Sequence, residues 1–295
     1  MDFVIDTHAL TRRYGEAIVA VDSLDLRVRR GEVYGFLGPN GAGKTTTLRM
    51  LLGLVRPTSG SATVLGEPPG APAALRRIGA MVEAPAFYPY LSGRDNLRVV
   101  ARRGGVPEDR VAAVLGQVDL SARAGDRAAT YSMGMKQRLG VAAALLMDPE
   151  LLILDEPTNG LDPAGMAEMR EFIRSLARGG RTVLLSSHLM GEIEQMSDRV
   201  GVIREGSLVA EGTVDELRGR TGLRVRADPL PEALDLVGRL PGVGPVTTVD
   251  GALDIAADAA EAPAINRALV EAGIAVSELS PRRASLEDVF LELTR

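Results

Sequence analysis

The stretch GPNGAGKTT at residues 38–46 restricts the possible folds more than any other feature of the chain. It has the P-loop spacing, in which a glycine and four further residues precede Gly-Lys-Thr. The preceding EVYGFLG predicts a buried strand, and the following KTTTLRMLLGL predicts a helix. Glycines at such a strand-to-helix turn let backbone N–H groups point inward at the positive end of the helix, where they bind phosphate. We therefore expect a nucleoside triphosphate site and not a glycine-rich turn without a ligand.

The residue types of this loop assign individual roles. The Lys44 ammonium is expected to reach the β- and γ-phosphates, and the Thr45 hydroxyl is expected to ligate Mg²⁺. The predicted cofactors are thus ATP and Mg²⁺. The predicted nucleotide-binding residues of the loop are Gly38, Pro39, Asn40, Gly41, Ala42, Gly43, Lys44, Thr45 and Thr46.

Two further segments end in polar residues that suit phosphate chemistry. LLILDEP at 151–157 predicts a strand buried on both faces of a parallel sheet, and ligands bind at the carboxyl edge of such sheets. Asp155 is expected to hold Mg²⁺, and Glu156 is expected to polarise the attacking water as general base. TVLLSSH at 182–188 predicts a second buried strand. His188 at its end is either structural or a contact to the γ-phosphate, and the neighbouring motifs favour the contact.

The overall composition excludes several classes of protein. With 34 basic and 39 acidic residues the net charge is −5, and aromatic residues are only 3%, which argues against a nucleic-acid partner. Without cysteine there are neither disulfides nor thiolate metal sites. No N-terminal signal pattern is present, and no uncharged run approaches the roughly 18 residues that a spanning helix needs. The chain is expected not to cross a membrane by itself.

Together these segments resemble the nucleotide-binding subunit of an ATP-binding-cassette (ABC) transporter. That family has a signature LSGGQ before a helix, and YSMGM at 131–135 occupies this place, with Ser132 and Gly134 matching and the other three positions departing. Ser132 and Gly134 are expected to present a hydroxyl and backbone N–H groups at a helix N-terminus. The resemblance implies that this site clasps the γ-phosphate held by the P-loop of a second copy. The alternative is an ordinary helix N-cap.

The resemblance also gives roles to three single residues. Tyr14 stands where the family stacks an aromatic ring on adenine, although simple packing of this tyrosine stays open. Asp162, in NGLDP, matches the loop that contacts the opposing P-loop across a dimer. Glu83 stands where the family usually has a glutamine, a departure that resembles the bacitracin and lantibiotic immunity branch of exporters. Its carboxylate is expected to ligate Mg²⁺ or to orient water.

The expected fold class is α/β, with a P-loop NTPase core, an antiparallel β layer and a helical subdomain. We expect a nucleotide-binding domain over residues 1–218, in which residues 3–35 form the antiparallel layer and about 84–148 the helical subdomain. The core is expected from about 37–75 and 150–210. Within the subdomain, Ser92 and Pro107 are expected to open helices. The aromatic cluster FYPYL at 87–91 is either a groove for a membrane partner or part of an apolar core.

The tail over residues 219–295 predicts a separate accessory α+β domain. Its pattern reads strand, helix, strand, strand, helix, strand, which is the order of a ferredoxin-like unit. The middle hairpin is expected to turn at Asp250–Gly251, and Ser285 is expected to cap a last amphipathic helix. Nothing in this tail has catalytic spacing, so we expect a dimer-stabilising or regulatory role.

The resemblance implies an ATPase subunit that powers a separate integral-membrane permease. Binding of ATP closes a head-to-tail homodimer and hydrolysis reopens it, so that the permease exports an antibiotic, peptide or lipid-like compound. The subunit is expected at the cytoplasmic face of a bacterial membrane, held there only through the permease. One alternative is a soluble ABC ATPase acting on ribosomes or DNA, but such proteins carry two cassettes or long insertions that this chain lacks. An importer ATPase is the other alternative.

Overall fold

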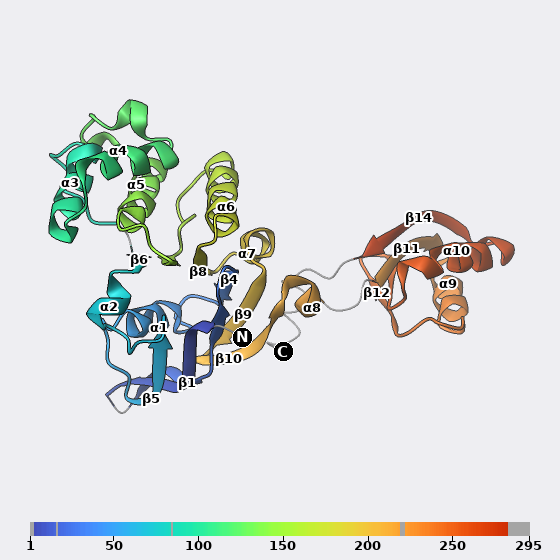
Figure 1. The fold of residues 1–295 in the computed structure, drawn as a ribbon. Coiled ribbons are helices and arrows are strands. Elements are labelled where there is room, and N and C mark those ends of the chain that lie inside the picture. Colours follow the sequence, from blue (N-terminus) through green and yellow to red (C-terminus); the bar gives the residue numbers. More distant parts are fainter. Residues whose placement is uncertain (1–2, 16, 84, 219–221, 283–295) are drawn as a thin grey trace. The chain divides into compact units, whose positions relative to one another are not determined.

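The computed structural model describes residues 3–15, 17–83, 85–218 and 222–282 (Figure 1). The chain divides into two compact units, Met1–Thr213 and Val214–Arg295. The predicted boundary lies after residue 218, whereas the short helix α8 (Val214–Arg218) falls in the second unit. Within the described ranges, none of the helices has the length and apolarity that a bilayer crossing requires.

A six-stranded central sheet organises the first unit. Its strand order is β10-β9-β4-β8-β7-β6, and every neighbouring pair is parallel except β9 and β10, which form a hairpin. Every residue of β4, β7 and β8 is buried, as expected for strands covered on both faces. The strands are β4 (Val33–Leu37), β6 (Ile78–Met81), β7 (Leu151–Asp155), β8 (Thr182–Ser187), β9 (Arg199–Arg204) and β10 (Ser207–Thr213).

A smaller antiparallel sheet forms a second layer, with β2 and β3 on either side of β1 and with β5 also paired to β1. Its strands are β1 (Phe3–Tyr14), β2 (Ile18–Leu24), β3 (Arg27–Arg29) and β5 (Ser59–Val64). The prediction that this layer runs to residue 35 is wrong, because Val33–Leu37 is buried throughout and joins the central sheet as β4. The prediction that 59–64 belongs to the P-loop core is also wrong, because β5 is mostly exposed and pairs antiparallel with β1.

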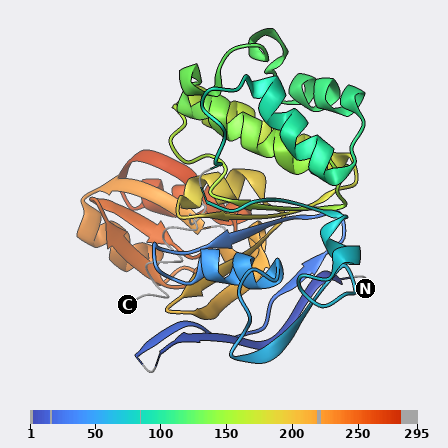
Figure 2. The same cartoon turned by 90° about the vertical axis from the view of Figure 1, so that its left-hand side faces the viewer.

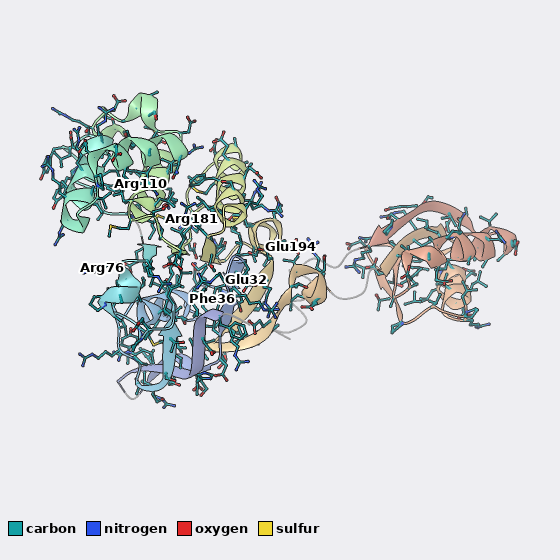
Figure 3. All side chains as sticks on the ribbon, viewed as in Figure 1. Glu32, Phe36, Arg76, Arg110, Arg181 and Glu194 are labelled. Atoms are coloured by element: carbon teal, nitrogen blue, oxygen red, sulfur yellow. The ribbon has the colours of Figure 1, made fainter. Side chains whose placement is uncertain are left out.

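Helix α1 (Lys44–Leu51) joins these two layers through one hydrophobic core. Leu48 of α1 is fully buried there, together with Val21 of β2 and Phe36 of β4. Phe36 is labelled in Figure 3. Removing this apolar surface from water at about 25 cal/mol per Å² is what holds α1 against both sheets. The position of the P-loop at the start of α1 is therefore fixed by core packing from both sides.

The helical subdomain lies on the side of the central sheet opposite the antiparallel layer, as Figure 2 shows. Its main helices are α3 (Gly93–Gly104), α4 (Glu108–Gln117) and α5 (Met133–Leu145). Ser92 caps α3 by accepting a hydrogen bond from the N–H of Asp95 at 3.0 Å, and Pro107 is the N-cap of α4, as predicted. The other helices of the unit are α2 (Pro72–Leu75), α6 (Pro163–Arg178), α7 (Met190–Met196) and the 3-10 turns η1 (Ser121–Arg123) and η2 (Ala128–Thr130).

The second unit has the predicted strand and helix order. Its four strands pair antiparallel in the order β12-β13-β11-β14, and α9 and α10 pack on this sheet around Leu223, Ile255 and Leu269. The predicted turn is confirmed, since Asp250 and Gly251 both have positive φ between β12 and β13. The helix predicted after Ser285 lies outside the described residues. The elements are β11 (Gly222–Asp228), α9 (Leu230–Val237), β12 (Val246–Val249), β13 (Ala252–Ile255), η3 (Ala259–Glu261), α10 (Ala262–Glu271) and β14 (Ala275–Arg282).

Candidate functional site

The P-loop connects the end of β4 to the start of α1. Gly43 is the N-cap of α1 with φ 106°, and no side chain caps the backbone N–H groups of the first turn. A Cβ at Gly43 would lie 2.3 Å from the backbone oxygen of Ala20, so the close approach of β2 requires glycine here. Gly41 also has positive φ, but a Cβ there would meet nothing within 4 Å. The loop is thus closely packed on one side and open on the other.

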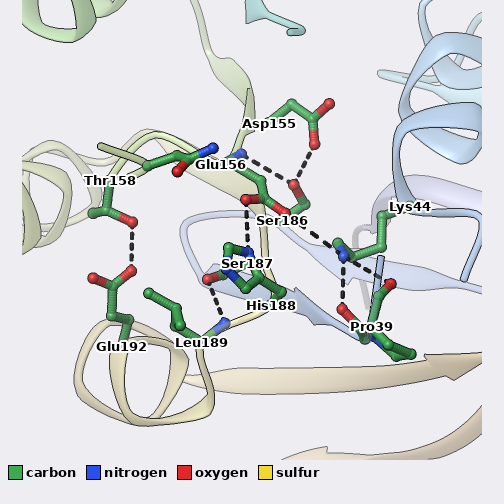
Figure 4. A network of polar contacts seen from close by, with 12 residues as sticks. Pro39, Lys44, Asp155, Glu156, Thr158, Ser186, Ser187, His188, Leu189 and Glu192 are labelled. Atoms are coloured by element: carbon green, nitrogen blue, oxygen red, sulfur yellow. Dashed lines mark hydrogen bonds and ion pairs between the residues drawn. The ribbon is translucent and has the colours of Figure 1, made fainter. Parts of the chain in front are cut away.

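The ammonium of Lys44 lies across this loop (Figure 4). It donates hydrogen bonds to the carbonyl oxygens of Gly38 at 2.6 Å and Pro39 at 3.1 Å. It also lies 3.7 Å from the Oε1 atom of Glu156. Burial lowers the pKa of Lys44, and the carboxylates of Glu156 and Asp155 oppose that shift. A buried cation is therefore held where the loop opens.

Asp155, the last residue of β7, is held by two hydroxyl groups. The Thr45 hydroxyl donates to Asp155 Oδ2 at 2.8 Å, and the Ser186 hydroxyl donates to Asp155 Oδ1. Ser186 also accepts the N–H of Glu156 at 3.1 Å, so one side chain orients both acidic residues. The sequence prediction missed Ser186, because a serine at a strand end does not by itself indicate which distant side chain it will meet.

Glu156 and His188 meet because they follow neighbouring parallel strands. Glu156 comes directly after β7 and has φ 48°, and His188 comes directly after β8. The His188 Nδ1 and Glu156 Oε2 atoms are 2.7 Å apart, as drawn in Figure 4. A histidine that orients a carboxylate in this way can fix the direction in which the carboxylate accepts a proton from water.

These side chains line a cavity of about 560 Å³. It brings together six of the predicted site residues and four that the sequence did not indicate. Its lining consists of Asn40, Thr45, Glu83, Met133, Gln137, Asp155, Glu156, Asn159, Gly160 and His188. Nearby, the Glu83 carboxylate forms an ion pair with Arg49 of α1.

Tyr14 does not line this cavity. It ends β1, its side chain is 39% exposed, and the guanidinium of Arg12 lies over its ring at 4.4 Å from the centroid. One face of the ring is therefore in contact with a cation. The role of Tyr14 in adenine binding stays a prediction.

Ser132, Gly134 and Asp162 line a different cavity, of about 590 Å³. Ser132 caps α5 by accepting the N–H of Met135 at 3.2 Å, and Asp162 caps α6 by accepting the N–H of Gly165 at 3.1 Å. Among the described residues, no P-loop residue lines this second cavity. Within one chain, Ser132 and Gly134 therefore line a different cavity from the phosphate loop, whereas Met133 of the same signature lines both cavities.

Two contacts near the cavity lined by Asp155 and Glu156 were not predicted. The Thr158 hydroxyl donates to Glu192 Oε2, which ties the segment after Glu156 to helix α7. The Gln137 side chain of α5 donates to the backbone oxygen of Asn159 at 3.3 Å. No local spacing in the sequence could have indicated either contact, because each joins residues that are distant along the chain.

The residues of the P-loop, with Asp155, fit a nucleoside triphosphate bound with a hard divalent cation. The open side of the loop offers uncapped N–H groups at the N-terminus of α1 beside a buried ammonium, which suits phosphate oxygens. Thr45 and Asp155 offer oxygen donors 2.8 Å apart. The described residues contain no group of three or more His, Asp or Glu side chains suited to a metal ion. A cation here would suit Mg²⁺, which takes one or two protein oxygens and completes its sphere with phosphates and water.

Comparisons with known proteins agree with this geometry. Residues 21–159 match the ABC transporter family. The bacitracin transport ATP-binding protein BcrA of Bacillus licheniformis is 43% identical, covering 99% of this chain and 98% of the relative. The daunorubicin resistance ATP-binding protein DrrA3 of Streptomyces coeruleorubidus is 42% identical, covering 99% and 96%.

A solved structure gives the same fold. It is the dimeric, post-hydrolysis state of an ATP-binding cassette bound to ADP and Pi, with a TM-score of 0.64, 22% identity, and coverage of 71% of this chain and 98% of that one. The predicted α/β fold with a P-loop NTPase core is thereby confirmed. The chain is a member of the ABC transporter family, and it is an ATPase subunit of that family.

Proposed function

We propose that this chain binds Mg²⁺-ATP, pairs head to tail with a second copy, and drives export through a separate integral-membrane permease. Lys44 and the N–H groups of the P-loop bind the phosphates, and Thr45 and Asp155 hold the cation. Glu156, oriented by His188, accepts the proton of the attacking water. The cargo is an antibiotic, a peptide or a lipid-like compound. The relatives named for bacitracin transport and daunorubicin resistance support export over import and over a ribosomal or DNA-bound role.

One observation carries the head-to-tail pairing. Asn40 and Thr45 of the phosphate loop line one cavity together with Met133, and the signature residues Ser132 and Gly134 line another. Helix N-termini with exposed N–H groups attract anions, and the N-terminus of α5 has no phosphate-binding loop of its own chain beside it in that second cavity. A second copy turned end to end places the γ-phosphate of the ATP on its own P-loop at this helix N-terminus. A solved cassette of the same fold is dimeric, which supports the pairing of two copies.

The absence of native cysteine makes a direct crosslinking test possible, because introduced cysteines can form disulfides only with each other. We combine Asn40→Cys and Ser132→Cys with Glu156→Gln, which is expected to bind ATP and not to hydrolyse it. Oxidation in Mg²⁺-ATP should then give a disulfide between two chains, seen as a dimer on a non-reducing gel. The matched control replaces Ser132→Cys by Arg76→Cys on the surface beside α2. ATP binding without any crosslink in the Asn40 and Ser132 pair would contradict the head-to-tail model.

The permease partner and the membrane location need a separate experiment. The exposed tyrosines Tyr88 and Tyr90, whose ring centroids are 5.8 Å apart, lie before α3 and are the surface that we expect to contact the permease. We expect the tagged chain to co-purify from membranes with one polytopic protein, and Tyr90→Asp to weaken that association while leaving ATP binding unchanged. Recovery of the chain with ribosomes instead of membranes would favour the ribosomal alternative.

A further inference from the structure

Arg49 of α1 lies one helical turn beyond Thr45, on the same side of the helix. Thr45 donates its hydroxyl hydrogen to Asp155, so this side of α1 is directed at the carboxyl edge of the central sheet. The Arg49 guanidinium forms an ion pair with the carboxylate of Glu83. Arg49 itself is absent from every motif that the sequence indicates.

Glu83 enters the site from the next strand of the sheet. It follows β6, which pairs parallel with β7 so that Met81 lies opposite Leu154. Glu83 therefore stands beside the end of β7 and lines the same cavity as Asp155. Its φ is 67°, a conformation that favours glycine, and its side chain is 61% exposed. At that exposure an ion pair contributes little to folding, and its main effect is on the charge of the site.

Three carboxylates at this edge each have their own partner on α1. Thr45 donates to Asp155 and the Lys44 ammonium lies 3.7 Å from Glu156. The third, that of Glu83, has the Arg49 guanidinium as its partner. A triphosphate is itself strongly negative, and like charges a few ångströms apart repel each other even in a partly aqueous site. Without the guanidinium of Arg49 beside it, the carboxylate of Glu83 would weaken phosphate binding.

We infer that Arg49 is a positioning residue of the nucleotide site, which holds the Glu83 carboxylate against α1 and offsets its charge. A glutamate at this position is then compatible with a bound triphosphate. The inference rests on the proposed function, because it requires ATP to occupy the cavity lined by Glu83. It goes beyond that function by assigning a role to a residue outside the phosphate loop, the catalytic pair and the signature.

The test is a double-mutant cycle of Arg49→Gln and Glu83→Gln, with KM for ATP and kcat measured at saturating Mg²⁺. Arg49→Gln alone should raise KM about five- to tenfold and change kcat less than about twofold, because an unpaired charge repels bound ATP in the ground state and in the transition state alike. In the Glu83→Gln background, the same change should alter KM less than about twofold. Arg49→Lys keeps the charge and should stay near wild type. Arg76→Gln, an exposed arginine beside α2, is the matched control.

An equal rise in KM in both backgrounds would overturn the inference, since Arg49 would then act independently of Glu83. A loss of kcat with constant KM would overturn it as well. If the protein binds ATP but does not hydrolyse it, the same cycle is measured as the equilibrium Kd of a fluorescent ATP analogue. In that case hydrolysis in the proposed function fails while the role of Arg49 is still decided. Thermal melts of each variant identify any change that only unfolds the chain.

Discussion

Substitution of Gly43 by alanine tests whether close packing against β2 shapes the phosphate loop. Two costs arise. An L-residue at positive φ loses about 1–2 kcal/mol, and Gly43 has φ 106°. In addition, the new Cβ would lie 2.3 Å from the backbone oxygen of Ala20, an overpacking that costs about 1–3 kcal/mol. Together these costs predict a destabilisation of about 2–5 kcal/mol.

Gly41→Ala is the matched control, because the two glycines belong to the same loop and differ in available space. Gly41 has φ 83°, and a Cβ there would meet nothing within 4 Å. It should therefore lose only the conformational cost of about 1–2 kcal/mol. The two variants thus differ by the overpacking cost of about 1–3 kcal/mol. For a domain of this size about 1 kcal/mol shifts Tm by 2–4 °C, so the Gly43 variant should melt about 2–12 °C below the Gly41 variant.

Tyrosine fluorescence is the assay for this comparison, since the chain has no tryptophan and all its tyrosines belong to the first unit. They are Tyr14, Tyr34, Tyr88, Tyr90 and Tyr131. The melts are recorded without nucleotide, so that lost ligand binding does not contribute. Equal melting temperatures for the two variants would refute the packing argument. A lower Tm for Gly41→Ala than for Gly43→Ala would also refute it.

Three further predictions concern the surface ion pairs of Glu150, the helix caps Ser132 and Ser92, and the contact between His188 and Glu156. Hydrogen bonds from Arg77 and then from Arg30 lower the pKa of Glu150 to about 2, below its value in the unfolded chain. The ionised Glu150 therefore stabilises the folded state above about pH 4.5, and this stabilisation is lost as the pH falls toward 2. Glu150→Gln should thus destabilise by at most about 1 kcal/mol at pH 7 and flatten the acid limb of a urea-unfolding series; a steeper limb would contradict this. Ser132→Ala and Ser92→Ala should each cost about 1 kcal/mol of stability as lost N-caps. Only the Ser132 change should abolish ATP-induced dimerisation in size-exclusion chromatography, and equal effects would count against the trans site. His188→Ala should lower kcat about 100-fold with KM for ATP within about threefold in a phosphate-release assay; an unchanged kcat would show that the histidine is only structural.

Much of the fold follows from local sequence patterns. The apolar stretches Leu151–Leu154 and Val183–Leu185 predicted buried strands, and both are found in the middle of the parallel sheet. The assignment of strands to sheets was less predictable. Val33–Leu37 and Ser59–Val64 were both assigned to the wrong layer, because local patterning gives the burial of a strand and not the identity of its neighbours. Those neighbours are set by contacts between distant parts of the chain.

The same division applies to the candidate site. Residues within one motif, such as Lys44 and Thr45, were predicted because fixed spacing on a loop and a helix brings them to one ligand. Ser186 and Arg49 were not, because they meet Asp155 and Glu83 across 31 and 34 residues of sequence. A serine at a strand end or an arginine on a helix surface has no spacing signal. Its role is defined only when the folded sheet places its partner beside it.

The order of strands explains why side chains of one helix can contact three carboxylates from different strand ends. Helix α1 follows β4, and the strands beyond β4 on one side are β8, β7 and β6 in turn. Because these strands are parallel, their carboxyl ends present His188, then Asp155 with Glu156, and then Glu83 along a single edge. The first turn of α1 contacts Asp155 at the end of β7 and Glu156 after it, and Arg49 in its second turn contacts Glu83, two residues after β6. In a sheet with β6 elsewhere, the same glutamate would be an ordinary surface residue. Its place in one cavity with Thr45 and Asp155, and its ion pair with Arg49, are consequences of topology.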